Sequence, residues 1–581
     1  MPVPSPVAQW VFHPSRLRDG ELVAVVGPNL KVSGFPRLKS GGLQLEGPWD
    51  AFTYPWYQWD RWPEVPKGNL TIDVLIELTP QKDPMGLVGC TFTPDTPNSE
   101  GPRGWVLTWE QGDVVFQVAT AQGKAQARIK NVPLRKRIAL TARYDQKQIT
   151  LFLDGVRVAS VDAALGTMTL NGRTPFAVGG WWQGDRTYGF RGTVHSYAVY
   201  GTALTDDQVR ELAAIRLPKL TSIPAPVEPA QATWVIEPTF QQVSTDTAWV
   251  VWEVSRTTPA RVRFGTENKL TRVRSSRPSR VHKVKLTGLT PETPYTVQIE
   301  VGGLVAKAQF TTLPTADKPV RVAIVGDTQD HPNINHQVAL GMRSHNPALG
   351  IIVGDLVGAG WQKDQWTGDF FASMRPLWAD VPLFPILGNH DRNAHIYYDL
   401  MALPPTLYHY SFRAGAAEIF TLDTGHPVQP GSVQYRWLEQ ALARSTARWK
   451  IAMHHYPPYS SDLDDYGTDL GDTETRDLCT LYDRYKVDMV FSGHIHSYER
   501  FHPIRAGKMA KEGTNYFVVG GGGGDLEQFL PNPPAFSAVR MSGHHYTILD
   551  ITPERLTLRA FTLDGKEFDR WESGITDSRI S

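Results

Sequence analysis

Five short segments in the second half of the chain place aspartate, asparagine or histidine beside glycine or proline. They are Gly326-Asp327-Thr328-Gln329, Gly354-Asp355, Gly388-Asn389-His390-Asp391, His454-His455-Tyr456-Pro457-Pro458 and Gly493-His494-Ile495-His496. Carboxylate, amide and imidazole donors without thiolate suit Mn, Fe, Zn or Co rather than a structural zinc knuckle. One such residue alone is more often a structural hydrogen-bonding group. Five segments together predict a metal site, provided that the fold brings them to one place.

Strongly apolar runs precede these segments, and each run reads as a buried strand. The expected strands are 320–325, 350–353, 382–387, 418–422, 450–453, 487–491 and 516–519, with helices at 335–346 and 433–444. Buried strands that alternate with helices predict an α/β domain whose sheets are covered on their outer faces. Because ligands bind at the carboxyl ends of such strands, the five segments are expected to converge there.

The order GD, GD, GNHD, H and GHxH resembles the signature of the calcineurin-like metallophosphoesterase superfamily, over about residues 319 to 575. Within it, the chain is similar to purple-acid-phosphatase-like enzymes, because a fibronectin-like segment precedes the motifs and GHIH continues as Ser497-Tyr498-Glu499-Arg500. The resemblance implies a four-layer αββα catalytic domain over residues 319–581. It also implies a binuclear metal centre that hydrolyses phosphate esters.

The resemblance further implies a role for each residue of the motifs. Asp355 would bridge the two metals, Asp327 and His496 would bind the first, and Asn389, His455 and His494 would bind the second. The family pattern of a strand followed by His-x-Pro fits His455 and not its neighbour His454. His454 is then left to contact the metal site or the substrate, or simply to pack.

The first metal site departs from both common versions of the family. Purple acid phosphatases carry a tyrosine three residues after the bridging aspartate, where this chain has Gly358, and many other members have a histidine where it has Gln329. Gln329 is expected either to coordinate through its carbonyl oxygen or to leave a water-filled position. Without the tyrosinate, selectivity for iron(III) is in doubt. The expected cofactor is a pair of divalent or mixed-valence ions of Fe, Mn or Zn.

Two cations a few ångströms apart would lower the pKa of a shared water, so that a bridging hydroxide attacks phosphorus near neutral pH. The expected catalytic residues are His390 and Asp391. His390 would protonate the leaving oxygen or stabilise its charge, with Asp391 holding its ring. A small phosphomonoester is the expected substrate, and a phosphodiester is the alternative because both reactions use the same ligands. A carbohydrate-binding or adhesion protein with an inactive phosphatase domain is a third interpretation.

A run of five glycines, Gly520 to Gly524, follows the last of the expected strands. It lacks the Lys-Ser/Thr pair of a nucleotide-binding loop. It is expected instead to let the backbone pass close to the metal site.

Before the motifs, two β-rich regions are expected. Residues 1–216 show short β-rich runs and a hairpin with an Asp154-Gly155 turn, in an order that resembles a laminin-G or concanavalin-A-like jelly roll. Residues 217–231 are a proline-rich linker. Residues 232–314 resemble a fibronectin type III β-sandwich, in which Tyr295 would be the corner tyrosine. Carbohydrate is a candidate partner of the jelly roll, and the side chains that could stack on it or fill its core are Trp56, Tyr57, Trp59, Trp62, Trp181 and Trp182.

The composition of the chain excludes several other classes of protein. The 581 residues exceed what one core holds, so several domains are expected. Lys+Arg 59 equal Asp+Glu 59, so no nucleic-acid or anionic-membrane surface is expected at whole-chain level, although a local patch could hide in this balance. The two cysteines, Cys90 and Cys479, exclude a disulfide scaffold. No membrane span or signal peptide is visible, but the architecture suggests a secreted or periplasmic protein.

Overall fold

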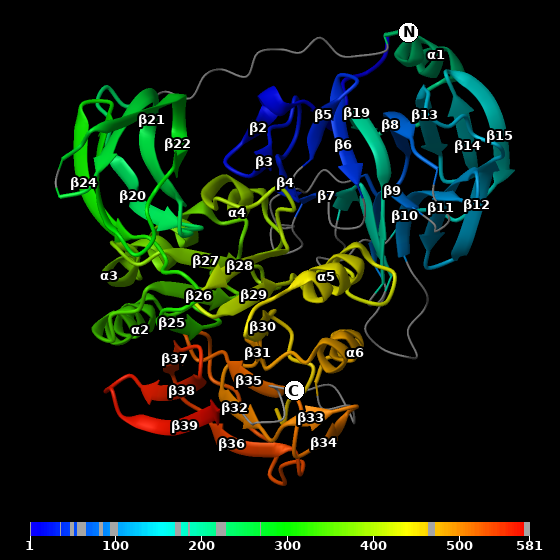
Figure 1. Cartoon of the computed structure of the whole chain (residues 1–581). Helices are drawn as coiled ribbons and strands as arrows, with labels where there is room; N and C mark the ends of the chain where they lie inside the picture. Colours follow the sequence, from blue (N-terminus) through cyan, green and yellow to red (C-terminus); the bar gives the residue numbers. More distant parts are fainter. Residues whose placement is uncertain are drawn as a thin grey trace. The chain divides into compact units, whose positions relative to one another are not determined.

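The computed structural model describes residues 2–34, 36–46, 51–54, 66–80, 85–92, 103–168, 176–183, 186–215, 228–267, 269–462 and 471–574. The chain divides into two units, Met1–Pro226 and Val227–Ser581 (Figure 1). Within the residues described, no helix has both the length and the apolar character needed to cross a membrane.

Short strands with buried apolar side chains build the first unit as two packed sheets. One sheet contains β15 (Val156–Asp162), β14 (Gln148–Leu153), β13 (Arg137–Tyr144), β8 (Leu70–Leu78), β19 (Arg191–Tyr200), β6 (Gly42–Glu46), β5 (Arg37–Lys39) and β1 (Ala8–Val11). The other contains β12 (Gly123–Ile129), β11 (Asp113–Thr120), β10 (Arg103–Glu110), β9 (Met85–Phe92), β16 (Phe176–Val178), β7 (Ala51–Tyr54), β4 (Leu30–Ser33), β3 (Glu21–Leu22) and β2 (Leu17–Arg18), while β17 (Gly180–Gln183) pairs with β18 (Arg186–Gly189). Strands of both sheets contribute to one core, where the rings of Trp10, Phe176 and Tyr197 stack. This is the predicted jelly-roll-like region.

The predicted hairpin of this unit is present between β14 and β15. Asp154 and Gly155 have φ angles of 49° and 79°, the left-handed backbone that a two-residue hairpin turn requires. After the last strand, α1 (Asp206–Ile215) begins beside Thr205, whose hydroxyl accepts the backbone N–H of Gln208.

Several predictions for the N-terminal region concern residues outside the described set. Residues 55–65 and 216–227 fall there, and so do the side chains of the β17 tryptophans. The carbohydrate-stacking role of Trp56, Tyr57, Trp59, Trp62, Trp181 and Trp182 and the proline-rich linker therefore stay predictions.

A long mixed sheet and a second sheet form the framework of the second unit. The long sheet contains β24 (Leu304–Thr311), β23 (Pro294–Val301), β21 (Thr247–Gly265), β22 (Arg272–Thr287), β20 (Trp234–Gln241), β27 (Leu383–Ile386), β26 (Leu349–Val353), β25 (Val320–Val325), β37 (His545–Ile551), β38 (Arg555–Thr562) and β39 (Glu567–Gly574). The second contains β28 (Tyr410–Ala414), β29 (Ala417–Thr421), β30 (Trp449–Met453), β31 (Met489–Ser492), β35 (Asn515–Val519), β32 (Tyr498–Phe501) and β36 (Ser537–Met541), and β33 (Ile504–Arg505) pairs with β34 (Lys508–Met509). The helices are α2 (Pro332–Ser344), α3 (Arg375–Trp378), α4 (His395–Leu400), α5 (Val433–Arg444) and α6 (Arg476–Tyr485), with a π-helical segment at Gln365–Ala372.

Successive residues of the central strands enter different cores, because neighbours along a strand face opposite sides of a sheet. Ile324 of β25 lies in the cluster that both sheets share. Its neighbour Val325 lies in another cluster with side chains of α2 and α3. On the second sheet, Ala452 and Val490 lie in a further cluster with side chains of α5 and α6. Each sheet is thus packed on both faces.

The fibronectin-like region, residues 232–314, is joined to the following domain by backbone and side-chain contacts. β20 pairs in parallel with β27 at Gln241 and Leu383. The Gln241 amide also accepts the backbone N–H of Ala402 at 2.7 Å. Within the region, the Tyr295 hydroxyl accepts the backbone N–H of Thr290 at 3.0 Å, the tie predicted for a corner tyrosine. The fibronectin type III assignment itself stays a prediction.

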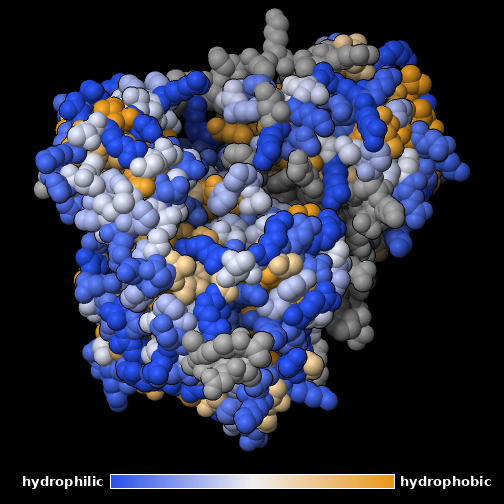
Figure 2. Space-filling view, viewed as in Figure 1, coloured by the Kyte–Doolittle hydropathy of each residue, from blue (hydrophilic) through white to orange (hydrophobic). Residues whose placement is uncertain are grey.

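Hydrophilic residues predominate on the face shown in the space-filling view, and apolar ones appear as small separate areas (Figure 2).

Both cysteines, Cys90 and Cys479, are buried and free. Their free state agrees with the prediction that disulfides do not hold this fold together.

Candidate metal centre

The candidate ligands leave the carboxyl ends of five strands of the second unit. Asp327 follows β25, Asp355 follows β26, Asn389 follows β27, His455 follows β30 and His494 follows β31. Three of them, Asp327, Asp355 and His494, have positive φ angles of 60°, 50° and 71°. Such backbone is costly for residues other than glycine and tends to persist at functional sites, where the surrounding structure enforces it.

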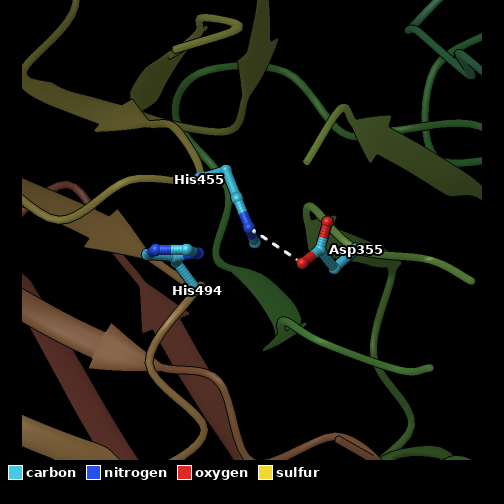
Figure 3. Close-up of side chains that lie close together, drawn as sticks. All are labelled: Asp355, His455 and His494. Atoms are coloured by element: carbon cyan, nitrogen blue, oxygen red, sulfur yellow. Dashed lines mark ion pairs between the residues drawn. The ribbon is translucent and has the colours of Figure 1, made fainter. Parts of the chain in front are cut away.

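Four of these side chains meet with short separations between their donor atoms. Nε2 of His455 lies 3.1 Å from a carboxylate oxygen of Asp355 and 2.9 Å from Oδ1 of Asn389. Nδ1 of His494 lies 3.1 Å from the same Asn389 oxygen. Asp355, His455 and His494 approach from different loops and face one space (Figure 3), and one donor atom from each lies within 4.8 Å of the others. The predicted second metal position is therefore assembled by the fold.

The residues of the predicted first position lie beside this group. Nε2 of His496 lies 3.6 Å from a carboxylate oxygen of Asp327 and 3.0 Å from the amide nitrogen of Gln329. Gln329 is fully buried, and its amide oxygen has no hydrogen-bond partner among the residues described. An unsatisfied buried acceptor next to a carboxylate and an imidazole is a suitable place for a cation.

Backbone carbonyls fix the orientation of three of the histidine rings. Nδ1 lies 2.9 Å from the Val353 oxygen in His455, 2.6 Å from the Asp525 oxygen in His496 and 2.9 Å from the Gly358 oxygen in His390. Each Nδ1 therefore carries a proton, which leaves Nε2 as the nitrogen that can bind a metal or meet a substrate.

The donor separations fit a divalent metal. Two ligand atoms about 2.1 Å from one cation and at right angles to each other lie about 3.0 Å apart. The His455–Asp355, His455–Asn389 and His494–Asn389 separations are 3.1, 2.9 and 3.1 Å. The carboxylate, amide and imidazole donors of these residues also suit Mn, Fe or Zn.

The charges of the group are arranged for a cation. Burial raises the pKa of Asp327 well above its ordinary value. Burial opposes the charged form of His455, but the nearby carboxylates of Asp355 and Asp327 outweigh it and raise its pKa to about 10. Burial and the charge of His455 lower the pKa of His494 to about 3. A metal ion would neutralise the two buried carboxylates in place of the proton on His455.

A family model described as calcineurin-like phosphoesterase matches residues 320–498. These residues are a calcineurin-like phosphoesterase domain. A second family model, described as the concanavalin A-like lectin/glucanases superfamily, matches residues 55–210. Both predicted resemblances are confirmed by these matches.

Named relatives share the phosphoesterase domain. Purple acid phosphatase 23 from Arabidopsis thaliana is 29% identical over 299 residues, which cover 42% of this chain and 62% of the relative. Probable inactive purple acid phosphatase 27 from the same plant is 28% identical over 320 residues, covering 45% of this chain and 52% of the relative. The match thus spans between half and two thirds of the length of each of these relatives. Since one of them is named as inactive, the likeness alone does not establish activity.

A solved structure shares the fold of the phosphoesterase domain. The purple acid phosphatase isolated from yellow lupin (Lupinus luteus) seeds aligns over 91% of this chain and 94% of its own chain, with a TM-score of 0.55 and 17% identity. This likeness concerns the fold.

Asp391 holds the loops of the phosphoesterase domain together, and the prediction that it holds the His390 ring is wrong. Its carboxylate accepts the backbone N–H groups of Gly388 at 2.8 Å, Leu356 at 2.9 Å and Val357 at 3.3 Å. The His390 ring is held by the Gly358 carbonyl instead. Asp391 therefore ties the loop after β26 to the loop after β27.

His455 rather than His454 faces the other ligands, as the His-x-Pro pattern of the resembled family predicted. Nδ1 of His454 lies 2.9 Å from the Tyr456 carbonyl oxygen, and its ring stacks on Tyr482 of α6. Burial lowers the pKa of His454 to about 4. His454 is thus a neutral packing residue on the helix side of the second sheet.

The glycine run passes over the first metal position with no room for side chains. A Cβ at any of Gly520 to Gly524 would lie 2.0 to 2.5 Å from its nearest neighbouring atom. At Gly524 that neighbour is the His496 ring, and a Cβ at Gly520 would lie 2.7 Å from a carboxylate oxygen of Asp327. The predicted close approach of this backbone to the site is present.

Asp330 occupies the space that a side chain at position 358 would need. A Cβ built on Gly358 would lie 2.3 Å from a carboxylate oxygen of Asp330. Asp330 has a positive φ of 69°. A tyrosine at position 358 would therefore collide with Asp330 in this loop arrangement.

Sequence reasoning missed Asp330 and also Glu527, whose carboxylate accepts the backbone N–H of His496 at 2.8 Å. Neither belongs to a motif block. The one available signal for Glu527 was its own position, as an acidic residue shortly after the glycine run.

Proposed function

We propose that this chain is a hydrolase of phosphate esters that uses two divalent cations, with a phosphomonoester as substrate. The observation that carries the proposal is the convergence of Asp355, Asn389, His455 and His494, with separations of 2.9 to 3.1 Å between donor atoms, at the ends of separate strands. The names of the relatives support a phosphatase.

Two bound cations would supply positive charge to the phosphoryl oxygens and activate water for attack. The chain's own residues would orient the substrate around them. His390 is tied at both its backbone N–H, which donates to Asp355 at 2.7 Å, and its Nδ1, which meets the Gly358 carbonyl. Its Nε2 is thereby the nitrogen available to donate a proton to the leaving oxygen.

Metal analysis combined with two assays tests this proposal. We expect about two ions of Mn, Fe or Zn per chain and turnover of p-nitrophenyl phosphate above that of bis-p-nitrophenyl phosphate. Dialysis against a chelator should remove both the metal and the activity, and one of these ions should restore them. A chain without bound metal that hydrolyses neither ester would contradict the proposal, whereas faster hydrolysis of the diester would assign the alternative substrate.

Gln329→His should strengthen the first metal position. Imidazole binds Zn²⁺ better than a neutral amide does, so we expect about tenfold tighter retention of the more weakly held ion. The measurement is the metal content that remains after dialysis against a series of chelator concentrations. Gln329→Leu removes the oxygen and nitrogen of the amide and keeps the bulk, so this variant should retain less metal than the unchanged chain. Equal metal retention in all three proteins would show that position 329 does not contact the ion.

A further inference from the structure

Residues 256–285 carry a strong local positive charge in a chain that is neutral overall. They contain ten lysines and arginines and one acidic residue, Glu267, whereas the whole chain has 59 of each sign. The rest of the chain consequently carries nine more acidic than basic residues. The charge balance of the whole chain allows a local basic patch, and residues 256–285 form one.

The structure places these residues on one ribbon, made of β21 and β22. The two strands are antiparallel neighbours, with Phe264 opposite Arg272 and Val262 opposite Arg274. Among the residues described, β22 pairs only with β21 and is therefore an edge strand. Arg272 and Arg274 lie on the same side of this edge, about 6.7 Å apart along the strand.

Arg263 and Arg280 of the ribbon pair with Glu300 and Glu253, whereas Arg272 and Arg274 are oriented by a ring and by oxygen acceptors that leave their charge in place. The Arg272 guanidinium lies over the Phe264 ring, 4.5 Å from its centroid, and donates to the Gly288 carbonyl at 3.0 Å. Arg274 lies 5.9 Å from the same centroid and donates to the Thr287 hydroxyl at 3.1 Å. In the described part of the chain, neither arginine makes an ion pair with a carboxylate, and the same is true of the exposed Arg277 and Lys285. The ring and oxygen contacts therefore fix the Arg272 and Arg274 guanidiniums without neutralising them.

From this arrangement we propose that the β21–β22 ribbon binds a linear polyanion with phosphate groups at short intervals. Seven of the ten basic residues are arginines, whose planar forks bind phosphate oxygens in pairs. Because cations without carboxylate partners on an edge repel one another, an ordered row of them is stabilised by a polymer that carries regular negative charge.

The ribbon is fixed to the phosphoesterase domain, so a bound polymer would be held in a defined position relative to the candidate metal centre. Lys283 of β22 donates to the Tyr398 carbonyl at 2.7 Å. Glu253 of β21, which is 1% exposed, pairs with Lys363 at 2.5 Å. Strands of this region and of the phosphoesterase domain also share one hydrophobic cluster.

Basic residues on an edge strand have another common role, which is to prevent pairing with the edge of a second molecule. That role predicts self-association when the charges are removed, and no effect on polyanion binding. The two roles are therefore separable by experiment.

The test is an anisotropy titration of the full chain with fluorescein-labelled inorganic polyphosphate at several salt concentrations, in excess orthophosphate so that the metal centre is occupied. We expect Arg272→Gln/Arg274→Gln to bind roughly tenfold more weakly, with a log–log salt slope smaller by about 1.4, for two lost contacts. Arg436→Gln/Arg444→Gln, which removes two exposed arginines of α5, should match the unchanged chain within about twofold.

Three results would overturn the proposal. The first is equal binding by both double variants, with or without self-association of the ribbon variant in light scattering. The second is loss of binding in orthophosphate, which would place the polymer at the metal centre. The third is equally tight binding of heparin, which carries sulfate in place of phosphate. Unchanged thermal unfolding of the ribbon variant checks that the sandwich is intact, and no outcome depends on hydrolysis.

Discussion

His390→Ala should lower kcat for a phosphomonoester by about 10²–10⁴-fold while the bound metal stays in place, the usual effect of losing a general acid. The backbone N–H of His390, which donates to Asp355 at 2.7 Å, is kept in the variant. The ring contact with the Gly358 carbonyl is lost, but it involves a half-buried side chain at the rim of the loop. The measurements are turnover of an alkyl phosphate, whose poor leaving group needs the proton, and metal content of the same sample.

An aryl ester with a good leaving group gives the matched control for this prediction. If His390 protonates the leaving oxygen, the variant should lose less rate with p-nitrophenyl phosphate than with an alkyl phosphate, whose leaving group needs the proton more. Equal losses would assign His390 to charge stabilisation. Full turnover with intact metal content would remove it from the mechanism.

Asp391→Ala should instead destabilise the second unit and lose metal. The substitution leaves three backbone N–H groups, at Gly388, Leu356 and Val357, without their acceptor in a fully buried place. Each unsatisfied donor costs about 1–3 kcal/mol, so a loss of about 3 kcal/mol or more in the free energy of unfolding is expected. Calorimetry of the full chain and metal analysis measure the two effects.

Asp391→Asn is the control for shape. Its oxygen can still accept from Leu356 and Val357, but its amide group would meet the N–H of Gly388 donor to donor, so an intermediate loss is expected. His390→Ala, one residue away, should change the free energy of unfolding by less than about 1 kcal/mol. If Asp391→Ala kept its stability and metal and lost only rate, Asp391 would be a catalytic residue after all.

Local patterns were sufficient to predict the elements that carry the ligands. The expected strand at 320–325 and helix at 433–444 coincide with β25 and α5, since both combine an apolar period with clear end signals. His455 was chosen over His454 because only His455 fits the His-x-Pro pattern of the resembled family. Because loops at the carboxyl ends of such strands meet, Asp355, Asn389 and His494 were expected to lie together. The structure brings them together.

Contacts between distant segments could not be predicted in this way. Asp391 reaches backbone N–H groups 34 and 35 residues away, and nothing in its own loop identifies them. β20 joins β27 across 142 residues, from Gln241 to Leu383, so the continuity of the two regions has no local signal. β21 runs unbroken from Thr247 to Gly265 although Pro259 lies inside it, because register shifts between Glu253 and Ala260 accommodate the missing N–H.

The glycine run sets a condition for function that the ligand motifs do not contain. A single added methyl group at Gly524 would press on the His496 ring, and one at Gly520 would press on Asp327, although every ligand residue remained. A chain can therefore carry the full set of metal-binding residues and still be unable to load metal. Among homologues with complete motifs, a side chain in this run marks those in which loss of activity should be sought first.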